Sequence, residues 1–179
     1  MYQGKNPTAL TSQRMLLDTL NKLLKEKDFK EITISELCCQ SGVSRQTFYS
    51  LFGSKENILL YQLEQANVTK PSPEDTSAIT LSQTCENFGR YVVSNYPQLS
   101  MLVENKLTEV LRVMIYNAMT TCSQSFVGLE TEEWEYAALF MSAGMCSLTK
   151  RYIETHEKPD KGELFKLSYK IMSGDIFKR

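Results

Sequence analysis

The sequence predicts an all-α protein built from a short N-terminal domain and a longer C-terminal domain. Its 179 residues are 42% hydrophobic and include only 8 Gly and 5 Pro, a composition that favours helices. Apolar residues recur at helical spacing along most of the chain. A polar, Pro-rich stretch, KPSPED at residues 70–75, interrupts this pattern. We therefore expect two domains, residues 1–69 and residues 70–179.

The first expected helix covers residues 8–27, and Phe29 then turns back into the core. Its apolar stripe contains Leu16, Leu20, Leu23 and Leu24. Thr33 and Glu36 form a capping box that opens a short second helix: the Thr33 hydroxyl accepts the backbone N–H of Glu36, and the Glu36 carboxylate reaches back. Gly42 ends this helix, because glycine adopts the left-handed conformation without a Cβ penalty.

A third helix, capped by Ser44, is expected to bury Phe48, Leu51 and Phe52. Two short helices joined by a Gly-containing turn make a helix-turn-helix. The outward side chains are then Arg45, Gln46, Thr47, Tyr49 and Ser50. In such a motif the N-terminal end of the motif's second helix, here the third helix of the chain, enters the major groove of DNA. Arg and Gln suit guanine and adenine edges, and hydroxyls suit phosphates, so the sequence predicts a DNA-reading helix.

A fourth helix follows, capped by Ser54, with Lys55 in its first turn. There the Lys55 ammonium and the free backbone N–H groups can both meet a phosphate. The chain as a whole has a net charge of −1, which excludes a general nucleic-acid coat. Residues 1–69 carry eight basic against seven acidic side chains, and residues 70–179 carry twelve against fourteen. Contact with DNA must therefore come from a local patch.

The second domain is predicted to contain five more helices. Their expected ranges are 81–95, 97–102, 107–126, 131–154 and 163–173. The 131–154 helix is apolar nearly all round, which indicates burial on more than one side. One side can serve its own domain and the other needs a partner, so we expect a homodimer. The alternative is a central helix of a monomer, since buried helices look alike in sequence.

The expected dimer interface lies on the last two helices. Its expected residues are Ala138, Met141, Ser142, Met145, Leu148, Leu164, Leu167 and Ile171. The small residues Ala138, Ser142 and Gly144 would allow two helices to approach closely.

No pattern in the sequence indicates an enzyme, a cofactor or a metal site. The five Cys residues, at positions 38, 39, 85, 122 and 146, form no C-x-x-C or His–Cys cluster, so most are interpreted as small apolar fillers. Redox sensing through an exposed Cys39 is kept as an alternative function. His156 is the single His and lies in a polar loop, where we interpret it as solvated. No secretory segment or apolar run of roughly 20 residues is present, so we expect a cytoplasmic protein.

Residues 29–59, FKEITISELCCQSGVSRQTFYSLFGSKENIL, resemble the N-terminal domain of the tetracycline-repressor (TetR) family. The matching pattern is Phe29, Thr33-Ile34, Leu37, Gly42-Val43-Ser44, Thr47-Phe48-Tyr49, Phe52, Lys55 and Leu59. The resemblance implies contacts with the DNA backbone from Thr33, Ser44, Thr47, Tyr49 and Lys55. It also implies that Arg45, Gln46 and Ser50 occupy positions that vary with the operator sequence.

The chain departs from the family pattern at a few positions. Leu51 stands where the family usually has His or Tyr, which removes one expected phosphate contact. Cys38 and Ser41 replace small residues and are mild changes. The weak basicity and Leu51 together motivate an alternative function, a co-regulator that keeps the fold but acts through a protein partner.

The C-terminal domain resembles the family in outline only. FMSAGMCSLTKRYIE, residues 140–154, is similar to the penultimate helix of many members, which with the last helix forms the dimer's four-helix bundle. The resemblance implies a repressor that binds a palindromic operator as a homodimer and is released by a small molecule of unknown identity. The expected ligand-binding residues are Tyr91, Met101, Met114, Met119, Cys122, Trp134 and Met141, with Tyr96, Tyr116 and Phe126 as further candidates.

Overall fold

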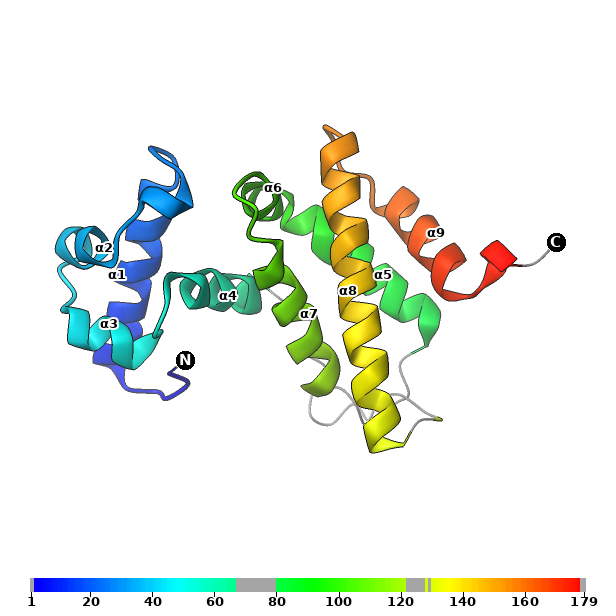
Figure 1. Cartoon of the computed structure of the whole chain (residues 1–179), viewed down its shortest axis with the longest axis horizontal. Helices are drawn as coiled ribbons and strands as arrows, with labels where there is room; N and C mark the ends of the chain where they lie inside the picture. Colours follow the sequence, from blue (N-terminus) through cyan, green and yellow to red (C-terminus); the bar gives the residue numbers. More distant parts are fainter. Residues whose placement is uncertain (1, 67–79, 122–127, 129, 178–179) are drawn as a thin grey trace. The chain divides into compact units, whose positions relative to one another are not determined.

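The regular elements of the computed structural model are helical throughout the part of the chain that it describes, residues 2–66, 80–121, 128 and 130–177 (Figure 1). The all-α prediction is therefore confirmed. The chain divides into two compact units, Met1–Gln65 and Ala66–Arg179. The predicted boundary at residues 70–75 lies outside the described residues and stays a prediction. Among the described helices, none combines the length and apolar character that crossing a membrane requires.

The first unit contains four α-helices: α1 (Pro7–Leu23), α2 (Ile34–Ser41), α3 (Arg45–Leu51) and α4 (Lys55–Ala66). Helix α1 ends four residues before its predicted end, because the charged segment that follows Leu24 has no apolar stripe to bury. The chain then forms a short 3₁₀ turn, Phe29–Glu31, whose Phe29 is buried as predicted. The apolar stripe of α1 and this Phe therefore form one side of the core on which α3 rests.

The predicted capping box at the start of α2 is only half formed. The Thr33 hydroxyl accepts the backbone N–H of Glu36 at 3.1 Å, as predicted. The Glu36 carboxylate does not reach back to Thr33 but pairs with the Lys27 ammonium at 2.5 Å. This bond to Lys27 is the main reason why the pKa of Glu36 is lowered. Glu36 pairs with Lys27 because an ammonium forms a stronger hydrogen bond to a carboxylate than a neutral N–H does.

Gly42 forms the turn between α2 and α3 with a φ of 69°, in the left-handed region, as the sequence predicted. A Cβ there would meet no atom closer than Met15 Cε at 3.9 Å, so the requirement for glycine is conformational rather than steric.

Replacing Gly42 by Ala should lower the free energy of unfolding of the first unit by about 1–2 kcal/mol, because an L side chain resists the left-handed conformation. Chemical denaturation of the purified protein measures this change. Cys39→Ala is the matched control, since Cys39 is exposed on the preceding helix, and it should change stability little. Equal stability of the Gly42→Ala and Cys39→Ala variants would contradict the prediction.

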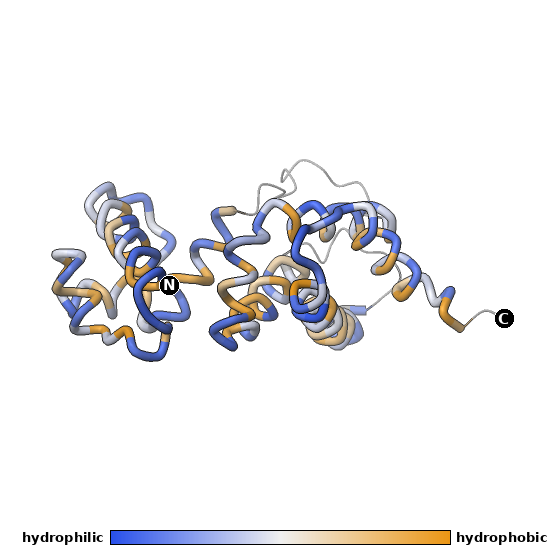
Figure 2. The backbone as a smooth tube through the Cα atoms, turned by 90° about the horizontal axis from the view of Figure 1, so that it is seen from above, coloured by the Kyte–Doolittle hydropathy of each residue, from blue (hydrophilic) through white to orange (hydrophobic). Residues whose placement is uncertain are grey.

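The described residues of the second unit form five α-helices, namely α5 (Leu81–Ser94), α6 (Tyr96–Glu104), α7 (Thr108–Thr121), α8 (Thr131–Thr155) and α9 (Lys161–Met172). A short 3₁₀ turn, Asp175–Phe177, follows. Within this unit α7 packs on α8 and α5 packs on α9, while α6 contacts both α7 and α8. Apolar and polar stretches alternate along these helices, as amphipathic helices require (Figure 2).

The predicted helix ranges of this unit agree with the structure to within a few residues. Cys122 and Phe126, placed by the prediction on the 107–126 helix, lie outside the described residues. Helix α9 begins at Lys161, two residues before its predicted start. The reason is Asp160, whose carboxylate accepts the backbone N–H groups of Gly162 at 2.6 Å and Glu163 at 3.0 Å. These bonds are the main causes of the lowered pKa of Asp160.

Half of the expected dimer-interface residues lie in the core of the single chain, and the interface itself stays a prediction. Ala138, Ser142, Met145 and Leu164 are buried within the chain itself and so line its own core. The other four keep exposed surface: Met141 and Leu148 are half-buried, and Leu167 and Ile171 are exposed. This placement was not predictable for a physical reason. In a helix that is apolar nearly all round, the sequence does not distinguish the face that meets its own domain from the face left outside.

Candidate nucleic-acid interface

Helix α3 is held in the first unit by its apolar side. Phe48, Leu51 and Phe52 are 0%, 3% and 2% exposed, and α3 packs against both α1 and α2. The side chains on the opposite face are left outside, as predicted: Arg45, Gln46, Tyr49 and Ser50 are exposed and Thr47 is half-buried. These side chains project from one short helix directly after the α2–α3 turn, which is the arrangement of a helix-turn-helix reading head.

The first turn of α3 is organised by hydroxyl groups. Ser44 Oγ accepts the backbone N–H of Thr47 at 3.1 Å, and the two hydroxyl oxygens lie 2.9 Å apart. Each hydroxyl has one donor and two acceptor positions, so this cap leaves bonding capacity for a phosphate. Ser44 is exposed, and Thr33 is exposed at the start of α2. Both helix starts of the motif therefore present capped, solvent-facing N-termini.

Two of the side chains predicted to contact DNA are oriented by neighbours. The Arg45 guanidinium donates a hydrogen bond to Ser35 Oγ in the first turn of α2. The Tyr49 ring packs edge-on against Phe48, with ring centres 5.2 Å apart and planes at 76°, while 55% of Tyr49 stays exposed. The contact with Ser35 was not predictable, because two exposed side chains ten positions apart show no periodicity in the sequence that links them.

Lys55 is bonded to groups within the first unit. Its ammonium donates to the backbone carbonyls of Phe29, at 2.8 Å, and Ile32, and lies 4.3 Å from the centre of the Phe29 ring. Burial is the main reason why the pKa of Lys55 is lowered. In this structure Lys55 therefore ties the start of α4 to the loop between α1 and α2. Its contact with DNA stays a prediction.

Replacing Lys55 by Met should lower the free energy of unfolding of the first unit by about 1–3 kcal/mol, because two carbonyls lose a charged donor. The slope of log affinity for DNA against log salt should change by less than about 0.9, which is the change expected when one phosphate contact is lost. Denaturation and salt titrations measure both effects. Lys30→Met is the charge-matched control at an exposed position on the same loop. Unchanged stability together with a loss of one full contact would contradict this structural role.

The predicted ligand-binding residues are spread over four helices of the second unit. Met114 and Met119 on α7 and Trp134 on α8 are buried, and α7 and α8 pack together. Tyr91, Met101, Met141 and Tyr116 are half-buried, and Cys122 lies outside the described residues. Burial raises the pKa of Tyr91 far above its usual value, so its hydroxyl stays protonated. A hollow of about 220 Å³ lined by Glu86, Arg90, Lys161, Gly162 and Phe165 contains none of the predicted residues.

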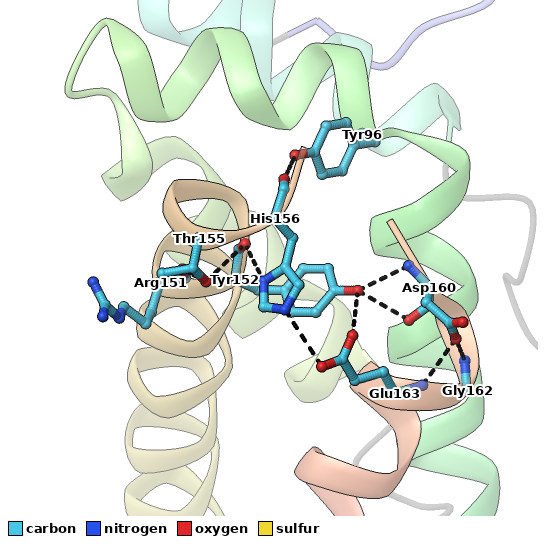
Figure 3. A network of polar contacts seen from close by, with 8 residues as sticks. All are labelled: Tyr96, Arg151, Tyr152, Thr155, His156, Asp160, Gly162 and Glu163. Carbon is cyan, nitrogen blue, oxygen red and sulfur yellow. Dashed lines mark hydrogen bonds and ion pairs between the residues drawn. The ribbon is translucent and has the colours of Figure 1, made fainter. Parts of the chain in front are cut away.

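His156 was predicted to be solvated, but in the structure it has several partners. Its ring stacks on Tyr152 at 4.2 Å, its Nε2 lies 3.3 Å from a Glu163 carboxylate oxygen, and its backbone carbonyl accepts the Tyr96 hydroxyl (Figure 3). The Tyr152 hydroxyl accepts the backbone N–H of Asp160 at 2.8 Å. The loop returns the chain to α9, and this brings the first turn of α9 beside the ring. The predicted ligand candidate Tyr96 therefore joins α6 to the α8–α9 loop.

Comparison with known proteins supports the interpretation of the first unit. Residues 16–61 match the family of bacterial regulatory proteins described as the tetR family. Over 58 residues the chain is 41% identical to the HTH-type transcriptional regulator EthR of Mycolicibacterium smegmatis, a stretch that covers 32% of this chain and 27% of EthR. The chain thus matches little more than a quarter of that relative's length.

Solved structures extend the similarity of fold to the second unit. Lin0861 from Listeria innocua has a TM-score of 0.76 at 14% identity, over 100% of this chain and 97% of that one. The dihydroxyacetone kinase operon activator DhaS has a TM-score of 0.52 at 15% identity, over 92% of this chain and 96% of that one. At such identities the likeness establishes the fold alone. The N-terminal helix-turn-helix domain is thus similar to that of the TetR family of bacterial regulatory proteins.

Proposed function

We propose that this protein is a homodimeric transcription regulator that reads a palindromic DNA operator through α3. The observation that carries the proposal is the division of α3 into two faces. Phe48 and Leu51 are buried, while Arg45, Gln46 and Tyr49 are exposed beside the capped N-terminus. Arg pairs with the O6 and N7 of guanine, and Gln pairs with adenine, in the major groove.

Formation of a dimer is supported by an unpartnered apolar stripe on α8. Ala137, Met141, Gly144 and Leu148 follow one another at intervals of three or four residues, and Phe140 lies beside Met141, so the five share one face of the helix. Phe140 is 81% exposed, and none of the five is buried in the chain. A second copy suits this face, because two identical reading heads about 34–36 Å apart are what a palindromic operator requires.

Ligand-released repression is the mode of regulation that we propose. The family resemblance and the Met- and aromatic-rich contact between α7 and α8 support an apolar small-molecule effector. A ligand that binds more tightly to a dimer with misplaced reading heads would lower operator affinity by the ratio of its two affinities. The ligand-binding residues and repression as the direction of regulation are part of this proposal.

A second candidate function is a co-regulator that acts through a protein partner. Two observations favour it: Leu51 is buried where the family usually offers a phosphate contact, and the Lys55 ammonium is bonded to backbone carbonyls. Fewer phosphate contacts mean weaker binding to DNA at physiological salt.

Selection of bound duplexes from a random DNA pool, at low and at physiological salt, separates the two functions. The operator-binding proposal predicts a palindrome whose affinity falls steeply as salt rises. If no sequence is enriched at either salt, direct operator reading fails and the co-regulator becomes the better account.

A further inference from the structure

The segment that precedes α1 is bonded to the end of α3. The backbone N–H of Tyr2 donates to the carbonyl of Leu51, the last residue of α3, at 2.8 Å. The carbonyl of Tyr2 accepts the side-chain amide of Gln13, on α1, at 3.2 Å. Residues 2–6, which we call the N-terminal strap, therefore connect α1 to the C-terminal end of the reading helix.

The strap has a compact conformation of its own. The Tyr2 ring folds back so that its hydroxyl accepts the backbone N–H of Asn6 at 3.2 Å. A Cβ on Gly4 would collide with this ring, so the fold-back requires glycine. Asn6 in turn caps α1, accepting the backbone N–H of Thr8 at 2.9 Å. The position of Tyr2 is thus fixed by bonds on both of its sides.

Gln13 is an unusual residue for the place it occupies. It is 1% exposed, on the same buried side of α1 as Leu16 and Leu20, where an apolar residue would be the common choice. Its Nε2 bonds to Tyr2, whereas its Oε1 has no hydrogen-bond partner within the described structure. A buried amide with one unpaired atom opposes folding, so its contribution lies in the bond to the strap.

Helix α3 needs such a support. It has seven residues, and helices that short are marginal without outside contacts. Its last carbonyls have no partner within the helix, and the strap supplies one at Leu51. The exposed reading residues Tyr49 and Ser50 stand directly before that carbonyl.

We propose that Tyr2 and Gln13 are positioning residues for DNA reading: the strap holds the end of α3 in its binding geometry before DNA arrives. This inference rests on the proposed operator-binding function. If the end of α3 frays in the free protein, the apparent operator affinity falls by the fraction of molecules that remain competent.

The strap bond to Leu51 is tested by comparing Tyr2→Pro with Tyr2→Ala in the full chain. Both variants lose the ring, but only proline removes the backbone N–H. The expected result is an operator affinity about 3- to 10-fold lower for Tyr2→Pro than for Tyr2→Ala, the range of one lost hydrogen bond. In the DNA-free protein, the amide hydrogens of Phe52 and Gly53, which both bond to the Phe48 carbonyl, should exchange faster in Tyr2→Pro.

Gln13→Leu separates positioning from simple stability. It removes the bond to Tyr2 and the unpaired amide oxygen together, so the unfolding midpoint should stay level or rise while operator affinity falls about 3- to 10-fold. A fall in affinity that only follows a fall in stability would overturn the positioning role. Equal operator affinities and equal amide exchange rates in all variants would show that the strap does not hold the end of α3. If the unaltered protein binds no duplex, the proposed function fails, and the DNA-free exchange rates still decide whether the strap holds α3.

Discussion

Replacing Arg45 by Ala should lower operator affinity by about 10- to 100-fold for each half-site, which is the range of one lost bidentate contact with a base. The loss should be specific to sequence. Discrimination should relax at one base pair in each half-site and stay intact elsewhere, because each side chain reads its own base edge. Competition binding with a set of single-base operator variants measures both effects.

Arg90→Ala is the matched control for this experiment. It removes the same charge from the second unit, where Arg90 forms an exposed ion pair with Glu86 at 2.8 Å. Operator affinity and base preference should both stay unchanged. If Arg45→Ala weakens binding equally on all sequences, Arg45 contacts only phosphate and the base-reading role is wrong.

Replacing Phe140 by Asp should separate the dimer into monomers. Phe140 is 81% exposed in the single chain and belongs to the apolar stripe on α8. In a homodimer the substitution would bury two carboxylates without partners, and the dimer dissociation constant should rise by about 100-fold or more. A monomer reaches one half-site only, so affinity for the palindrome should fall steeply while that for an isolated half-site stays level.

Leu139→Asp is the control for the dimer experiment. Leu139 is 42% exposed and lies on the same helix, about 100° around the axis from Phe140. It should leave the dimer intact, as measured by analytical ultracentrifugation. Dissociation by both substitutions would place the interface on a broader surface than the stripe. Dissociation by neither would contradict the proposed interface.

The reading helix was predictable because local rules agree with one another there. A left-handed glycine, a Ser cap and the buried Phe48, Leu51 and Phe52 all fix the same register, and that register decides which side chains face outward.

The side of α8 was not predictable for the opposite reason. Nearly every face of that helix is apolar, so only packing against α7 could show that Ala138 and Ser142 lie inside.

The positions of long polar side chains were the second limit. Lys55 could reach a phosphate or the carbonyls of a neighbouring loop, and the sequence contains no measure of which lies nearer. The Glu36 carboxylate likewise had two possible partners, the backbone N–H of Thr33 and the Lys27 ammonium, and it pairs with Lys27. The His156 ring stacks on Tyr152 of α8 and lies beside Glu163 of α9, and both contacts depend on the path of the loop between these helices. Tertiary contacts of this kind do not follow from residue type and spacing.

Methylation interference on the selected duplex shows whether α3 reads base edges in the major groove. Guanine N7 lies in the major groove and adenine N3 lies in the minor groove. We expect N7 methylation to block binding at guanines in two clusters, related by the symmetry of the palindrome and about one helical turn apart. Binding that is insensitive to N7 methylation, or blocked only by methylation at adenine N3, would contradict it.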